Sequence, residues 1–216
     1  MIPVLKQPIP ADFDDAIMRR KGEEFLKKHR DCEKVDFKNA DHWRLATDAL
    51  NKAYRGICAY TCFYIPGGGQ VDHFLPKSKK EYRHLAYEWS NFRLASGKVN
   101  SIKNQATDVL DPFLIESGWF VIDFPSCQVR PADNLSSDIE TKIRKTIDIL
   151  KLNKHDRFVQ DRCQIMQDFM NGKIKLSHME THYPFLAAEI IRQKINSDDD
   201  QIFKSLPLSI KPPRDG

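Results

Sequence analysis

Three short stretches decide how this chain folds: VDHFLPKS at residues 71–78, WSNFRL at 89–94 and VNSIK at 99–103. The first opens with a β-branched residue, and the second alternates polar and apolar side chains as a short strand does. Gly97 separates the second stretch from the third, which has the pattern of a short helix. The order therefore predicts strands followed closely by a helix.

The residues just before this region predict where the chain turns. An aromatic and β-branched run at 57–65 is followed by the glycine-rich segment 66–69 and then by Val71. Two extended runs around a glycine-rich turn are typical of a hairpin. We therefore expect a hairpin around 66–69, a further strand at 88–94 and a short helix at 98–105.

Helical patterns flank this unit on both sides. Apolar residues recur at three- and four-residue steps in 43–53 upstream, and in 139–150 and 185–191 downstream. The expected fold class is therefore α+β, with a small hairpin-and-helix unit held between helical flanks. We divide the chain into a helical N-terminal flank, the central unit, a mostly helical C-terminal part and a tail, at residues 1–56, 57–105, 106–204 and 205–216.

Composition excludes several classes of protein. Apolar residues make up 41% of the 216 and charged residues 30%, which is enough to form a core and excludes a wholly disordered chain. No segment approaches the roughly 18 continuous apolar residues of a membrane span, so we expect no membrane partner. The five cysteines are odd in number and mostly isolated, which is typical of a reducing compartment and predicts a cytoplasmic protein.

Charge permits a polyanionic partner. The formal net charge is +4, and the segment from Val71 to Gln105 holds seven Lys or Arg residues against three Asp or Glu residues. A basic run is most often only a solvated surface, but here it coincides with the residues that could carry chemistry.

Three side chains in the central unit fit the cleavage of a phosphodiester. A neutral histidine such as His73 can deprotonate a water molecule near pH 7. The oxygen atoms of Asp72 and Asn100 suit a hard divalent cation such as Mg²⁺, which keeps several of its waters. Adjacent residues of a strand point to opposite faces, so Asp72 and His73 can share a site only if the strand bends or ends there.

Each of these residues also has a plain structural interpretation. An isolated Asp-His pair occurs by chance, His73 could be a hydrogen-bonded core histidine, Asn91 a turn residue and Asn100 a helix cap. The set in this order, with strand and helix signals around it, favours the functional interpretation. A motif remains a hypothesis until its structural context is known.

The same residues resemble a known family. Asp72-His73, Asn91 and Asn100 are similar to the His-Asn-Asn form of the HNH endonucleases, whose nuclease unit is called ββα-metal or His-Me finger. The phrases VDHFLPKS, YEWSNFRL and VNSIKN are most similar to the subgroup that accompanies an ATPase in Septu-type antiphage systems. The resemblance touches most of the chain, but only residues 71–104 carry it specifically.

This resemblance implies a role for each position. His73 would be the general base, and Asn91 would hydrogen-bond backbone across the loop and so aim His73. Asp72 and Asn100 would bind one Mg²⁺ ion, and Mn²⁺ would be able to take its place. Lys77 and Lys103 would contact phosphate. The substrate would be DNA, the product would carry a 5′-phosphate, and the partner would be an ATPase subunit of a defence complex.

The sequence departs from the family at one point. Relatives often carry two Cys-x-x-Cys pairs that bind a structural zinc, whereas this chain has Cys58-Ala-Tyr-Thr-Cys62 and then Ser-Gly-Lys-Val at 96–99. We therefore expect no structural zinc and expect aromatic packing, with Tyr60, Phe63 and Trp89, in its place. Because the zinc-binding cysteine pairs are lost, an alternative remains open. In this alternative the chain is a catalytically inactive module that binds nucleic acid or the ATPase as a scaffold. A helical adaptor with no nucleic-acid role is a third interpretation.

Overall fold

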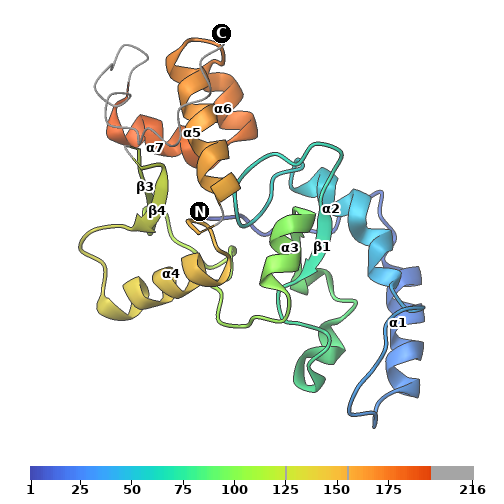
Figure 1. The fold of residues 1–216 in the computed structure, drawn as a ribbon. Helices are drawn as coiled ribbons and strands as arrows, with labels where there is room; N and C mark the ends of the chain where they lie inside the picture. Colours follow the sequence, from blue (N-terminus) through green and yellow to red (C-terminus); the bar gives the residue numbers. More distant parts are fainter. Residues whose placement is uncertain (125, 155, 196–216) are drawn as a thin grey trace.

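The computed structural model describes residues 1–124, 126–154 and 156–195, and it has the expected α+β architecture (Figure 1). Two small antiparallel sheets are surrounded by α-helices and short 3₁₀ helices. The N-terminal elements are α1 Ala16–Lys28, η1 His42–Ala46 and α2 Thr47–Ala53. The central elements are β1 Gln70–His73, η2 Lys80–Leu85, η3 Trp89–Asn91, β2 Phe92–Ala95 and α3 Gly97–Lys103. The C-terminal elements are β3 Phe120–Asp123, β4 Gln128–Pro131, α4 Ser137–Ile149, α5 Asp156–Met170, α6 Leu176–His182 and α7 Pro184–Gln193.

The central sheet consists of β1 and β2, which pair antiparallel with Asp72 opposite Arg93 and His73 opposite Phe92. The hairpin expected around residues 66–69 is therefore wrong in its pairing, since β1 pairs with the strand that returns at residue 92. Residues Ile57 and Tyr64 form only an isolated bridge with each other.

The glycine-rich turn has a different role from the one expected. The side chain of Asn51 on α2 accepts a hydrogen bond from the backbone N–H of Gly69 at 2.7 Å and donates to its carbonyl at 3.2 Å. Gly67 and Gly68 both have positive φ, which an L side chain adopts with strain. The turn is thus fastened to α2 and directs the chain into β1.

Helix α3 follows β2 after one residue and completes a strand–strand–helix unit. The side chain of Ser96 caps its first turn by accepting a hydrogen bond from the N–H of Val99. Val99 and Lys103, four residues apart, are buried on the same side of the helix. Lys103 contacts the end of β1, and β1 also contacts η1 and α2.

Two apolar cores lie on either side of the central unit. The N-terminal core joins α1, α2 and one face of the central sheet, and it includes Met18, Leu50, Val71, Phe92 and Leu94. The larger core joins the C-terminal helices and the second sheet with Tyr60, Ala95 and Val99. The central unit is therefore held rigidly between the two flanks.

The C-terminal part is mostly helical, as expected, and also contains the hairpin of β3 and β4. Strand β4 packs on α4, strand β3 packs on α7, and α6 contacts α7. The N-cap of α4 is Ser136, whose side chain accepts from the N–H of Ile139. The tail expected at 205–216 lies outside the described residues. Within the described ranges, no helix combines the length and the apolar character needed to cross a bilayer.

Candidate functional site

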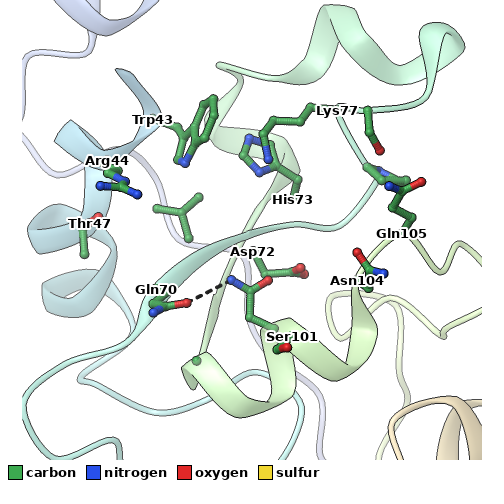
Figure 2. A pocket seen from close by; sticks show the side chains of 15 residues that line it. Trp43, Arg44, Thr47, Gln70, Asp72, His73, Lys77, Ser101, Asn104 and Gln105 are labelled. Atoms are coloured by element: carbon green, nitrogen blue, oxygen red, sulfur yellow. Dashed lines mark hydrogen bonds between the residues drawn. The ribbon is translucent and has the colours of Figure 1, made fainter. Parts of the chain in front are cut away.

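A pocket of about 680 Å³ opens between the N-terminal flank and the central unit (Figure 2). One wall comes from η1 and α2, another from the end of β1 and the loop after it, and the third from α3 and the residues that follow it. The lining residues are Trp43, Arg44, Thr47, Gln70, Val71, Asp72, His73, Pro76, Lys77, Ser78, Gly97, Asn100, Ser101, Asn104 and Gln105. The pocket therefore gathers Asp72, His73, Lys77 and Asn100 of the expected site residues.

Asp72 and His73 reach the pocket from opposite faces of β1. The Asp72 side chain shares its face with Arg93 and meets α3, whereas His73 shares its face with Phe92 and meets the aromatic ring of Trp43. Both line the same pocket because the strand ends at His73. This is the arrangement that neighbouring strand residues need in order to share a site.

The imidazole of His73 is held in one orientation. It is 6% exposed, and the rings of Trp43 and Phe92 contact it edge-on at centroid distances of 5.0 and 5.4 Å. Its Nε2 donates a hydrogen bond to the carbonyl of Ala86 at 2.8 Å, and because a carbonyl can only accept, the proton of the neutral ring lies on Nε2. Nδ1 has no hydrogen-bond partner among the residues that the structure describes.

Electrostatics keep this ring neutral. Burial, and secondarily the positive charge of Lys77, lower the pKa of His73 to about 3. At neutral pH His73 therefore has a proton on Nε2 and an available lone pair on Nδ1.

The carboxylate of Asp72 is buried but well hydrogen-bonded. It is 2% exposed, the hydroxyl of Tyr60 donates to Oδ2 at 2.5 Å, and the Lys103 ammonium donates to Oδ1 at 3.1 Å. Burial raises the pKa of Asp72, and the charge of Lys103 opposes this shift. Each carboxylate oxygen has two lone pairs, so both can still accept a further interaction.

Asn100 lines the pocket from the second turn of α3. Its Nδ2 donates to Oε1 of Gln70 at 3.2 Å, which leaves Oδ1 without a partner in the described part of the chain. A carboxylate and an amide oxygen are suitable ligands for Mg²⁺, and the pocket has room for the waters that this ion keeps. No cluster of three His, Cys, Asp or Glu side chains that could hold a metal occurs among the described residues, so water would have to supply most of the coordination.

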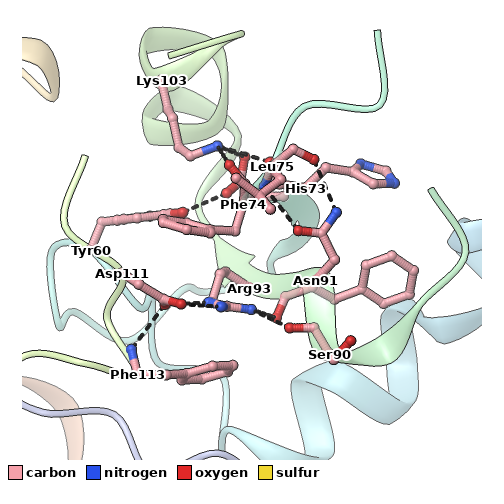
Figure 3. Close-up of polar contacts among 12 residues, drawn as sticks. Tyr60, His73, Phe74, Leu75, Ser90, Asn91, Arg93, Lys103, Asp111 and Phe113 are labelled. Carbon is pink, nitrogen blue, oxygen red and sulfur yellow. Dashed lines mark hydrogen bonds and ion pairs between the residues drawn. The ribbon is translucent and has the colours of Figure 1, made fainter. Parts of the chain in front are cut away.

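Asn91 lies beneath the loop that follows β1. Its Oδ1 accepts from the N–H of Leu75 at 2.9 Å, and its Nδ2 donates to the carbonyl of Leu75 at 2.9 Å (Figure 3). Nδ2 also donates to the carbonyl of Leu85 at 3.3 Å. The side chain thus bonds backbone across the loop, as the resemblance implied, and fixes the segment directly after His73.

The two expected phosphate contacts have different environments. Lys77 lines the pocket, and its Nζ lies 4.4 Å from the centroid of the Trp43 ring. Lys103 is 1% exposed and donates to Asp72 and to the carbonyls of His73 and Phe74. The expectation that Lys103 contacts phosphate is therefore corrected, because its three protons are already used inside the protein.

Sequence reasoning missed several residues that shape the site. Trp43 and Arg44 come from the N-terminal flank and form one wall of the pocket. Tyr60 was expected to pack as an aromatic residue, whereas its hydroxyl binds Asp72. Cys58 and Cys62 are buried free thiols. The helical spacing of Asn100 and Lys103 was the one signal that could have placed Lys103 beside the site.

Comparison with known proteins gives one informative likeness. No protein-family model matches the chain. The chain is 26% identical over 114 residues to the Septu protein PtuB of Bacillus thuringiensis, an alignment that covers 53% of this chain. The alignment spans 42% of that relative, well under two thirds of its length. By sequence, the chain is thus a distant relative of a Septu protein.

Proposed function

We propose that this chain is a metal-dependent HNH endonuclease that hydrolyses phosphodiester bonds of DNA. The observation that carries the proposal is the state of His73, a neutral, oriented imidazole with an unpartnered Nδ1, in the same pocket as Asp72 and Asn100. A buried histidine with a purely structural role would be expected to use both of its nitrogens.

His73 would act as the general base. Its Nδ1 would take a proton from a water molecule in the pocket, and the Nε2–H bond to Ala86 would hold the ring in the required tautomer during this transfer. Asn91 would keep the loop after β1 in place and so maintain the position of His73. The attack would leave a 5′-phosphate and a 3′-hydroxyl.

Asp72 and Asn100 would hold the cation through one carboxylate oxygen and one amide oxygen. A bound Mg²⁺ would supply neutralisation of the charge that develops on the phosphate and on the leaving oxygen. Lys77 and Arg44, which line two walls of the pocket, would attract the phosphate backbone.

The likeness to the Septu protein supports a role in antiphage defence. We propose that the chain is the nuclease of such a system and that it works with an ATPase subunit. Co-expression with a neighbouring ATPase followed by size-exclusion chromatography tests the partnership: co-elution is expected, and a free 25.1 kDa chain under all conditions would contradict it.

The nuclease proposal is tested by nicking of supercoiled plasmid with Mg²⁺, with and without EDTA. His73→Ala should lower the rate by about 10² to 10⁴-fold, which is the usual contribution of general base catalysis. His84→Ala is the matched control, because His84 is an exposed histidine of η2, in the connection between β1 and β2. Equal cutting by the His73 variant and the parent would refute the assignment.

An inactive scaffold is the second candidate. The observation that favours it is that both oxygens of Asp72 already have partners within the protein. A scaffold would bind DNA or the ATPase but would not cut with Mg²⁺ or Mn²⁺, even in the presence of the partner.

A further inference from the structure

A buried polar cluster joins Asp72 to Tyr60 and Lys103 (Figure 3). The Lys103 ammonium makes three hydrogen bonds, to Asp72 Oδ1 at 3.1 Å, to the His73 carbonyl at 2.9 Å and to the Phe74 carbonyl at 3.0 Å. Three acceptors match the three protons of an ammonium group, so the buried cation is fully satisfied.

The position of Lys103 on α3 links this cluster to Asn100. Lys103 follows Asn100 by three residues, so both side chains project from neighbouring positions on α3. Lys103 therefore ties the helix that carries Asn100 to the side chain of Asp72 and to the backbone at the end of β1. Without it, the carbonyls of His73 and Phe74 would lose a partner just where the strand stops.

Tyr60 donates the second hydrogen bond to the Asp72 carboxylate. Its ring is fully buried in the C-terminal core, and its hydroxyl binds the carboxylate oxygen that Lys103 does not use. The two donors together fix the rotation of the carboxylate. Groups that orient a metal ligand in this way commonly contribute to metal affinity without touching the metal.

We propose that Lys103, assisted by Tyr60, is a positioning residue that sets the Asp72 carboxylate and the Asn100 amide at the separation needed to bind one divalent cation. This inference rests on the proposed function, since it concerns the same cation. It replaces the phosphate contact first expected of Lys103.

The experiment is Mn²⁺ binding by the intact protein, followed by the electron paramagnetic resonance signal of free Mn²⁺. Lys103→Met keeps the length of the side chain and removes the ammonium, and it should weaken Mn²⁺ binding about 10 to 100-fold. The Mn²⁺ concentration that gives half-maximal plasmid nicking should rise in proportion. Lys98→Met, which removes a charge from the same helix at a position where the lysine lies over Phe158, should bind Mn²⁺ like the parent.

Tyr60→Phe provides a second test that does not depend on how Lys103→Met folds. It removes one hydroxyl and keeps the ring in the core, so it should weaken Mn²⁺ binding about fivefold, the usual effect of one lost hydrogen bond. Unchanged affinity in Tyr60→Phe, or affinity equal to or tighter than that of the parent in folded Lys103→Met, would overturn the positioning role.

The variant Asp72→Asn distinguishes a failure of this inference from a failure of the proposed function. If Asp72→Asn binds Mn²⁺ as the parent does, the cation does not use Asp72 and both proposals fail. If Asp72→Asn loses binding while Lys103→Met and Tyr60→Phe keep it, the metal site stands and the positioning role fails. When Asp72 is already changed, adding Lys103→Met should cause a smaller loss of affinity than it causes in the parent, because part of the effect of Lys103 acts through Asp72.

Discussion

The two small sheets of this protein have the same size and pairing but very different contents. Each consists of two antiparallel strands of four residues. The sheet of β1 and β2 buries Asp72, His73 and Arg93, whereas β3 and β4 bury apolar side chains and leave the charged Arg130 exposed. Their connections differ as well, since only residues 124–127 separate β3 from β4, whereas a long loop with two 3₁₀ helices joins β1 to β2.

The comparison distinguishes buried side chains that stabilise a sheet from buried side chains that line the pocket. The second hairpin packs on α4 and α7 through hydrophobic burial, and the buried carboxylate of Glu189 on α7 accepts a hydrogen bond from the N–H of Ile122 at 2.8 Å. The first sheet carries buried ionisable groups that need dedicated partners, such as Tyr60, Lys103 and Asp111. Burying charge is unfavourable unless it is paired, and the buried Asp72, His73 and Lys103 around one pocket support the proposed function there.

The largest expected effect on stability is at Arg93. This guanidinium is 3% exposed, forms two bonds to Asp111 at 2.9 and 2.6 Å and stacks on Phe113. Arg93→Met leaves Asp111 without its partner and should lower the free energy of unfolding by about 3–5 kcal/mol. Arg130→Met in the other hairpin breaks an exposed pair with Asp133 and should cost at most about 1 kcal/mol. Urea unfolding measures both, and equal losses would remove the contrast between the sheets.

A smaller effect is expected at Asn91. Asn91→Ala removes the partners of the Leu75 N–H and carbonyl and should cost about 1–3 kcal/mol. Plasmid nicking should fall as well, because the loop after His73 loses its anchor. The control is Asn171→Ala, an exposed asparagine, and a loss no greater than in this control would show that Asn91 does not hold the loop.

The dependence of stability on pH provides a third test, performed in EDTA. Because the pKa of His73 falls from 6.5 to about 3 on folding, the unfolded chain binds a proton between these values that the folded chain does not. The free energy of unfolding should therefore decrease as pH falls below 6.5, with a contribution of up to about 1.4 kcal/mol per pH unit. His73→Asn should show a shallower decrease over this range. Identical pH profiles for variant and parent would contradict the neutral, buried state of His73.

The smallest effect is expected in the second hairpin. Ile122→Val removes one buried methylene group from β3 and should cost about 0.5–1.5 kcal/mol. Nicking at a temperature where both proteins are folded should be unchanged. A large loss of nicking would mean that this hairpin takes part in the site, and the distinction between the two sheets would fail.

Parts of this structure could be predicted from the sequence because their signals are local. Helical periodicity predicted the flanks, and the structure places Asp72 and His73 on β1, Asn91 on η3 and Asn100 on α3. The pairing of β1 was not predictable in this way, since the glycine turn at 66–69 resembled a hairpin turn but is fastened to α2 by Asn51.

The surroundings of the site were also beyond the reach of local signals. Lys103 belongs to a basic run, and a lysine in such a run usually lies in solvent. Its burial depends on Asp72 and on the carbonyls at the end of β1, which are about thirty positions away in the chain. The carbonyl of Ala86 and the wall formed by Trp43 likewise depend on tertiary packing.

The central claim is that Asp72, Asn100 and His73 form one site for a single divalent cation and a phosphate. Anomalous diffraction from crystals soaked in Mn²⁺ tests it most directly, because it locates the ion independently of activity. We predict one strong peak in the pocket, bonded to an oxygen of Asp72 and to Oδ1 of Asn100, with Nδ1 of His73 facing the water side of the ion. A pocket without such a peak, or an ion bound elsewhere on the protein, would contradict the account.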